Sequence, residues 1–145
     1  MRHGKGCGHH KDGFTLIELL AVMAILSILV TIALPTYHDL VRKSRRADAT
    51  TELFRIQLEQ ERYRAIHQHY AEGLTTLGWS ADEVDSPGGH YRLALVSVED
   101  PVTAFQARAV PRSDSDQIHD TCGTLTINQD GPGLDDPEQA DCWSR

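Results

Sequence analysis

The apolar residues of this chain are concentrated in one block near its amino terminus. Residues 14–34 read FTLIELLAVMAILSILVTIAL, a run of 21 residues in which Glu18 is the only charged side chain. A helix of that length spans about 31 Å, which is close to the thickness of the hydrocarbon core of a bilayer. The block therefore predicts a membrane-spanning helix, and the alternative is a helix buried in the core of a soluble protein.

A second helical pattern follows the apolar block. Pro35 has no amide hydrogen to donate to the carbonyl of Thr31, so we expect a kink near residues 31–35. From there to residue 67, apolar positions recur every three or four residues in two overlapping stripes. We expect one helix of about fifty residues, far longer than a globular average, whose apolar face past Leu53 packs on a sheet. The two stripes comprise Tyr37, Leu40, Val41, Ser44, Ala47, Thr51, Phe54 and Leu58, and then Leu53, Ile56, Tyr63, Ile66 and Tyr70.

The rest of the chain has the two-residue period of β-strands. Residues 90–98, 103–110 and 123–128 alternate apolar and polar positions, and their short connections favour antiparallel pairing. Residues 71–85 predict an irregular connection. The expected fold class is therefore α+β, with a long N-terminal helix packed on a small antiparallel sheet.

The charge of the chain changes sign along its length. Residues 1–13 carry three basic residues and one acidic residue. Because positive charge beside a membrane span favours the cytoplasm, we expect the amino terminus to stay inside and the residues after Leu34 to be exported. From residue 72 onward there are four arginines, no lysine and 14 acidic residues. That segment should repel phosphate, and the formal charge of −7 for the whole chain also disfavours a free nucleic-acid-binding protein.

The basic leader meets the apolar block at a glycine. A secretory signal is cut after its apolar run, but Ala33-Leu34-Pro35 lacks the small-residue pattern of such a site. A cut after Gly13 would instead remove the leader and keep the anchor.

A family resemblance begins at this glycine. The processing and N-methylation motif of type IV pilins and of type II secretion pseudopilins is similar to the stretch Gly13-Phe14-Thr15-Leu16-Ile17-Glu18-Leu19-Leu20. The resemblance implies that prepilin peptidase, a membrane aspartyl peptidase, cuts between Gly13 and Phe14 and methylates the new amino group of Phe14. It also implies that Glu18, together with Pro35 at the end of the apolar block, serves filament assembly.

The chemistry of Glu18 agrees with an assembly role. A carboxylate in hydrocarbon costs about 3 kcal/mol, so an unpaired one is disfavoured. Cleavage would create a positive amine on Phe14, four residues earlier on the same helix face. That amine, in the same or a neighbouring subunit, would neutralise Glu18, and only correctly staggered subunits would satisfy the pair. The alternative is a protonated glutamate that merely tolerates the membrane.

The cysteines support an exported head. Cys122 and Cys142 would lie in an oxidising compartment and predict a disulfide, which a head of this small size needs. The loop between them resembles the C-terminal disulfide-bounded region of type IV pilins. The expected domains are the cleaved leader, the transmembrane and assembly helix, the amphipathic continuation of the helix and the head, at residues 1–13, 14–34, 35–70 and 71–145.

Within the family, the chain is most similar to the minor pilins of the priming and assembly group. This resemblance implies a structural subunit and not an enzyme, first anchored in the bacterial inner membrane and then part of an extracellular pilus. Its partners would be other pilin subunits in a helical filament, prepilin peptidase and the inner-membrane assembly platform. The processes implied are pilus biogenesis, twitching motility, adhesion or DNA uptake. The alternatives are a major pilin, a type II secretion pseudopilin and a DNA-binding receptor pilin, and the acidic head argues against direct nucleic-acid binding.

Three further clusters carry candidate chemistry. The basic run 42–46 is expected to form a solvated face that pairs with lipid headgroups or acids, and the alternative is a polyanion contact. Leader residues that could bind a metal are His3, Cys7, His9 and His10. We expect no cofactor, with a weak alternative of calcium at Asn128, Asp130, Asp135, Asp136 and Glu138, because clustered oxygens suit that ion but the closing bidentate glutamate is missing.

Overall fold

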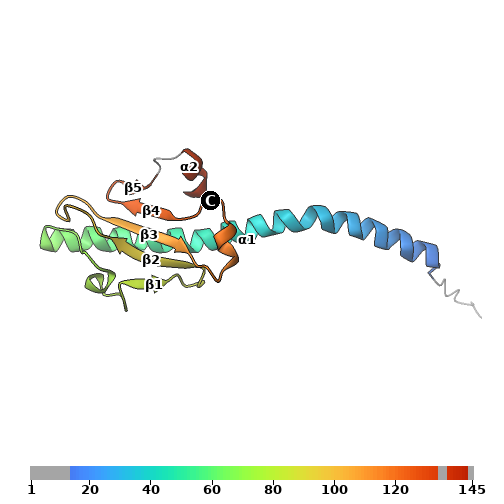
Figure 1. Cartoon of the computed structure of the whole chain (residues 1–145), viewed down its shortest axis with the longest axis horizontal. Helices are drawn as coiled ribbons and strands as arrows, with labels where there is room; N and C mark the ends of the chain where they lie inside the picture. Colours follow the sequence, from blue (N-terminus) through green and yellow to red (C-terminus); the bar gives the residue numbers. More distant parts are fainter. Residues whose placement is uncertain (1–13, 134–136, 144–145) are drawn as a thin grey trace, which may run out of the picture. The chain divides into compact units, whose positions relative to one another are not determined.

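The structure is a computed structural model that describes residues 14–133 and 137–143. It forms two compact units, the first ending at His38 and the second beginning at Asp39. Helix α1 (Leu16–His67) has 52 residues and contributes to both units, so the expected helix of about fifty residues is confirmed (Figure 1). The helix continues through Pro35, whose side chain lies outside the described residues, and the kink stays a prediction.

In the first unit, α1 is an exposed apolar helix. By length and composition, α1 contains a stretch that could cross a membrane. The hydroxyl of Ser27 donates to the carbonyl of Met23, and that of Thr31 donates to the carbonyl of Ser27, both at 2.7 Å. These bonds matter because an unpaired hydroxyl is costly in hydrocarbon.

In the second unit, a five-stranded sheet lies against the C-terminal part of α1 (Figure 1). All neighbouring strands are antiparallel and follow one another in chain order, so the sheet is a meander. The strands are β1 (Glu83–Asp85), β2 (Tyr91–Val96), β3 (Gln106–Pro111), β4 (Leu125–Asn128) and β5 (Gly131–Pro132).

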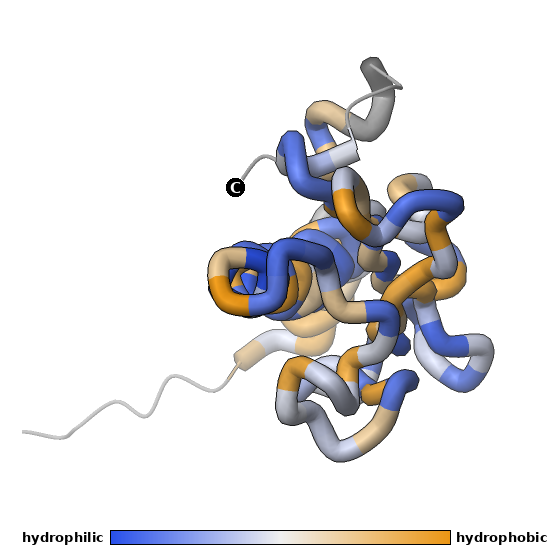
Figure 2. The backbone as a smooth tube through the Cα atoms, turned by 90° about the vertical axis from the view of Figure 1, so that its left-hand side faces the viewer, coloured by the Kyte–Doolittle hydropathy of each residue, from blue (hydrophilic) through white to orange (hydrophobic). Residues whose placement is uncertain are grey.

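The core lies between α1 and one face of the sheet. Ala49, Leu53 and Ile56 recur at helical spacing and are fully buried. They pack against alternate residues of the strands, because every second side chain of a strand faces the helix. Hydrophobic and hydrophilic positions accordingly interleave along the chain of the head (Figure 2). The strand residues of the core are Tyr91, Leu93, Ala107, Ala109, Leu125 and Ile127.

The three expected strands are confirmed as β2, β3 and β4, with shorter bounds than the sequence indicated. The expectation of an irregular connection over 71–85 is wrong in part, because this segment holds the 3₁₀ helix η1 (Leu74–Leu77) and β1. The assignment of Ile66 to the packed stripe is wrong: it is 76% exposed, because it lies on a different side of α1 from the buried Ile56 and Gln60.

A disulfide joins Cys122 and Cys142, whose Cα atoms are 5.8 Å apart. It closes a loop that carries β4, β5 and the short helix α2 (Pro137–Trp143). Trp143 packs edge-on against Phe54 of α1, with ring centroids 5.6 Å apart. The disulfide-bounded C-terminal region expected from the sequence is therefore present, and it contacts the helix as well as the sheet.

Candidate functional site

The first candidate site is the amino-terminal end of α1. Phe14 is 78% exposed, and the large apolar side chains of residues 16–34 are all exposed in the chain by itself. A contiguous apolar surface of this size is unfavourable in water and marks a contact with lipid or protein. The segment is therefore built to be covered by something outside this chain.

Glu18 lies in the first turn of α1, three residues after Thr15, which caps the helix. The amide of Glu18 donates to the carbonyl of Thr15 at 3.1 Å and approaches the Thr15 hydroxyl at 3.4 Å. Threonine followed three residues later by glutamate is the sequence pattern of a capping box, of which the structure forms the contact to the Thr15 hydroxyl. A negative charge in the first turn also favours the helix dipole. Among the described residues no hydrogen-bond or ion-pair partner is present for the Glu18 carboxylate, and Gly13 lies outside the described residues.

The second unit presents an exposed seam on α1, which we call the outer seam. Its residues alternate spacings of four and three, and they lie opposite the buried stripe through Ala49, Leu53 and Ile56. Leu40, Phe54 and Leu58 are about half exposed or more, and small residues lie between them. Such a seam is the pattern that receives another helix. The outer seam comprises Leu40, Ser44, Ala47, Thr51, Phe54 and Leu58.

The basic run 42–46 is partly turned toward the head. Arg42 pairs with Asp116 at 3.3 Å, and Arg46 forms two hydrogen bonds with Asp120, at 2.6 and 3.0 Å. The expected pairing of this run with acids is therefore confirmed for Arg42 and Arg46, although Arg46 and Asp120 are largely covered and not solvated. The sequence could not identify the partners because they lie more than 70 residues away.

A buried polar network surrounds Asp120. Its Oδ2 accepts from the Tyr91 hydroxyl at 3.2 Å and from the Gln117 amide at 2.5 Å. Burial raises the pKa of Asp120, but hydrogen bonds from Arg46 and from the amide of Cys122 outweigh it, so the pKa is lowered. Burial raises the pKa of Tyr91 to about 12. The network fastens α1 to the head next to the disulfide.

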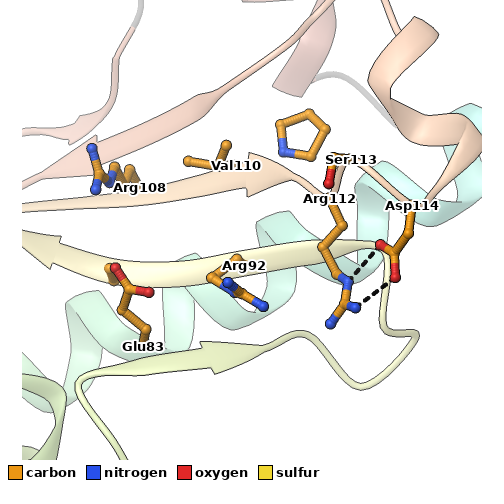
Figure 3. Close-up of a pocket in the computed structure, with 9 residues that line it drawn as sticks. Glu83, Arg92, Arg108, Val110, Arg112, Ser113 and Asp114 are labelled. Atoms are coloured by element: carbon orange, nitrogen blue, oxygen red, sulfur yellow. Dashed lines mark hydrogen bonds and ion pairs between the residues drawn. The ribbon is translucent and has the colours of Figure 1, made fainter.

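Three arginines gather on the face of the sheet that is turned away from α1 (Figure 3). We call Arg92, Arg108 and Arg112 the arginine face. Because β2 and β3 pair Arg92 with Val110 and Ala94 with Arg108, the first two arginines are diagonal neighbours on one face. All three residues of the arginine face line a hollow of about 500 Å³.

Acidic residues neutralise part of the arginine face. Arg92 pairs with Asp85 at 3.3 Å, and Arg112 pairs with Asp85 and with Asp114. The hydrogen bond from Arg112 lowers the pKa of Asp114 to about 2. No ion-pair partner of Arg108 is found in the part of the chain that the structure describes.

The net charge of the residues beyond 71 does not reveal this cluster, because a net charge says nothing of where the charged side chains lie. The alternation of side chains along β3 does indicate the position of Arg108. Because Ala107 and Ala109 face the core, Arg108 must face outward.

The calcium hypothesis gains no support. Asp130 lies in the exposed turn between β4 and β5, where its amide donates to the Asn128 side chain at 2.8 Å. Asp135 and Asp136 lie outside the described residues. Within residues 14–133 and 137–143, no group of three or more His, Cys, Asp or Glu side chains is placed to hold a metal ion.

Comparison with known proteins identifies similar chains among pilins. Over 94 residues the chain is 38% identical to a fimbrial protein of Moraxella nonliquefaciens, which covers 65% of this chain and 59% of that protein. It is 28% identical over 123 residues to a probable minor fimbrial protein of Dichelobacter nodosus, covering 84% and 74%. It is 35% identical over 71 residues to the competence protein ComGC of Halalkalibacterium halodurans, covering 48% and 68%.

Two family models match adjoining parts of the sequence. Residues 8–34 match the prokaryotic N-terminal methylation motif. Residues 35–126, well over half of the chain, match the family described as "Type IV minor pilin ComP, DNA uptake sequence receptor". The exposed apolar helix, the meander sheet and the C-terminal disulfide agree with these matches. The chain therefore belongs to this family of type IV minor pilins.

Proposed function

We propose that the chain is made as a precursor, cut by prepilin peptidase between Gly13 and Phe14, and built into the pilus through α1. The observation that supports this most is the exposed apolar segment 16–34, which requires a cover from outside the chain. Lipid covers it before assembly, with the amino terminus in the cytoplasm, and the helices of neighbouring subunits cover it in the filament. The outer seam offers a second helix contact farther along α1.

The capping of α1 explains how Glu18 is held for its partner. Thr15 caps the helix, so Glu18 lies in its first turn, about one helical turn from the new amine of Phe14. In the filament this carboxylate pairs with the Phe14 amine of the same or the neighbouring subunit. In a medium that excludes water the attraction is several times stronger than in solution, so a subunit in the wrong register is rejected.

Processing is tested by replacing Gly13 in the full chain, expressed in a piliated bacterium. Gly13→Leu should leave a membrane-bound precursor that still contains residues 1–13, because the peptidase must close over a small residue. Wild type and Ser27→Ala, a control inside the apolar block, should begin at Phe14 by intact-mass measurement and carry one extra methyl group. A mature-sized product from Gly13→Leu would refute the proposed cut.

The arginine face supports a second candidate function, contact with duplex DNA from the surface of the pilus. The matched family is described as a DNA uptake sequence receptor, and three of the four arginines beyond residue 71 lie on this one face. This revises the expectation that the acidic head repels DNA, because local charge and not net charge decides a contact with phosphate. Arg108, without an ion-pair partner among the described residues, is available at once, whereas Arg92 and Arg112 would exchange carboxylate for phosphate.

Fluorescence anisotropy with labelled duplex DNA tests this second function on the detergent-solubilised full chain. Arg108→Gln should weaken binding several-fold and reduce the slope of log affinity against log salt by about one. Arg62→Gln, an exposed arginine of α1 with the same charge change, is the matched control and should bind as wild type does. An equal loss in both variants, or none in either, would contradict DNA contact through this face. Filament assembly should be normal in both.

A further inference from the structure

Two histidine rings meet where α1 ends. His67 is the last residue of the helix, and His69 follows two residues later. Their ring centroids are 6.1 Å apart, and both side chains are exposed. The ring of Tyr63, one turn earlier, stacks on His67 at 4.1 Å and meets His69 edge-on at 5.5 Å. We call Tyr63, His67 and His69 the terminal ring cluster.

The backbone brings the two histidines together through Gln68. This residue has φ of 64°, in the left-handed region that side chains other than glycine rarely adopt. Its amide donates to the carbonyl of Arg64 at 2.8 Å, which ends the helix. The chain then reverses direction, so that His69 returns to the ring of His67. A left-handed residue that is not glycine is a constraint that often accompanies a functional site.

One hydrogen bond decides which nitrogen of His69 is available. Its Nδ1 lies 2.9 Å from the carbonyl oxygen of Tyr70. A carbonyl oxygen only accepts, so Nδ1 must carry the proton and donate. In the neutral ring the lone pair is then on Nε2. Histidines that bind metals are typically fixed in this way, with the second ring nitrogen donating to a carbonyl or carboxylate.

We propose that His67 and His69 form a two-imidazole site for a divalent transition metal ion. A metal–nitrogen bond of about 2 Å places the ion roughly 3 Å from a ring centroid, so two rings that share an ion have centroids up to about 6 Å apart, and the observed 6.1 Å lies at that limit. Both side chains are exposed and are therefore free to turn a ring nitrogen toward the ion. Imidazole ligands suit copper, nickel and zinc, and Cu²⁺ binds tightest among divalent ions of the first row. Within the described residues no third His, Cys, Asp or Glu completes the site, so water or another subunit fills the remaining positions.

A titration with Cu²⁺, followed by electron paramagnetic resonance, tests the site on the full chain in detergent. The leader ligands are first removed with His3→Asn, Cys7→Ser, His9→Asn and His10→Asn. This background should bind one equivalent of Cu²⁺ and show hyperfine splitting from two nitrogens. His67→Gln and His69→Gln should each weaken Cu²⁺ binding tenfold or more. Loss of a group that only hydrogen-bonds a metal ligand already has an effect of about that size. His119→Gln, an exposed histidine outside the cluster, should leave the affinity unchanged.

The same series distinguishes a metal site from simple ring packing. Tyr63→Phe keeps the stacking ring and should bind Cu²⁺ like the background. The exposed substitutions should leave the circular dichroism spectrum and the melting temperature unchanged, so that a loss of binding reports the ligands and not unfolding. Copper binding of undiminished affinity in the double variant His67→Gln/His69→Gln would overturn the proposal, as would binding that depends on His119.

Discussion

Arg46 and Asp120 lie 74 residues apart in the sequence and form a doubly hydrogen-bonded ion pair, with N–O distances of 2.6 and 3.0 Å. Their side chains are 13% and 2% exposed. The pair joins α1 to the segment just before Cys122, and Gln117 extends the connection by donating to the carbonyl of Arg42. The head is therefore fixed to the helix by a polar clamp as well as by the apolar core.

Removing one partner of this pair should destabilise the second unit strongly. In Arg46→Met the stem of the side chain is kept, but Asp120 is left buried without its countercharge. The expected loss of unfolding free energy is about 3 kcal/mol. Denaturant unfolding of the detergent-solubilised chain, followed by tryptophan fluorescence, measures it. Arg45→Met, at the neighbouring position of the run, serves as control. Equal stability of the two variants would show that the core alone holds the head on α1.

The carboxyl group of Asp120 should also make the stability of the folded chain depend on pH. Because the pKa of Asp120 is lower in the folded chain than its ordinary value, folding favours the ionised form. Its contribution is fully present above the ordinary value near 4 and is lost as the pH falls through the folded pKa. Unfolding free energy should therefore decline below about pH 4, and Asp120→Asn should flatten that decline. An unchanged acid profile in Asp120→Asn would exclude Asp120 as the group responsible.

The disulfide should stabilise the head in addition to the polar clamp. The two cysteines are separated by 20 residues in the sequence. A crosslink of that loop size stabilises the folded state by about 3 kcal/mol, because it lowers the chain entropy of the unfolded state. In a Cys7→Ser background, maleimide should label no thiol until reductant is added. Cys122→Ser/Cys142→Ser should melt at a lower temperature and unfold with less denaturant. Labelling of the unreduced chain at either position would contradict a fully formed bridge.

Gln68 provides a test of backbone strain at the end of α1. Glycine adopts its left-handed conformation without a steric penalty, so Gln68→Gly should stabilise the chain by about 1 kcal/mol, less the entropy that glycine adds to the unfolded state. Thermal unfolding measures the change. Gln68→Val should instead destabilise, because a branched side chain is the least tolerant of this conformation. The opposite order of the two variants would mean that the turn relaxes when this side chain is changed.

The sequence predicts the parts of this fold that depend on one-sided burial. Leu93 and Leu95 alternate with polar or small neighbours, so their spacing alone predicts the strand β2. By contrast, β1 has a single apolar residue, Val84, and β5 contains Pro132, which disfavours a strand. Both are short edge strands that form because a neighbouring strand is already in place. No local pattern encodes that dependence.

The candidate sites divide in the same way. The processing site and Glu18 lie in one contiguous motif, which can be read from eight residues. The arginine face and the Arg46–Asp120 pair join segments that meet only in three dimensions, so charge counting misses them. Strand parity could have placed Arg92 and Arg108 on one face. It could not have shown that Asp85 engages Arg92, because that contact depends on how the two side chains extend from neighbouring strands.

The structure allows the charge of Glu18 to be tested apart from its place in the helix cap. Glu18→Gln keeps a polar side chain at the third position of the capping box but removes the charge. If Glu18 pairs with the Phe14 amine, both Glu18→Gln and Glu18→Ala leave that amine unpaired in an apolar filament core, at a cost of about 3–5 kcal/mol per contact. Both variants should therefore be cleaved, remain in the membrane at near wild-type level and be absent from sheared filaments. Thr15→Ala removes the cap hydroxyl and leaves the charge, so it should still enter filaments. Incorporation of Glu18→Gln at the wild-type level would show that apolar packing alone sets the register, and exclusion of Thr15→Ala would assign the effect to the cap.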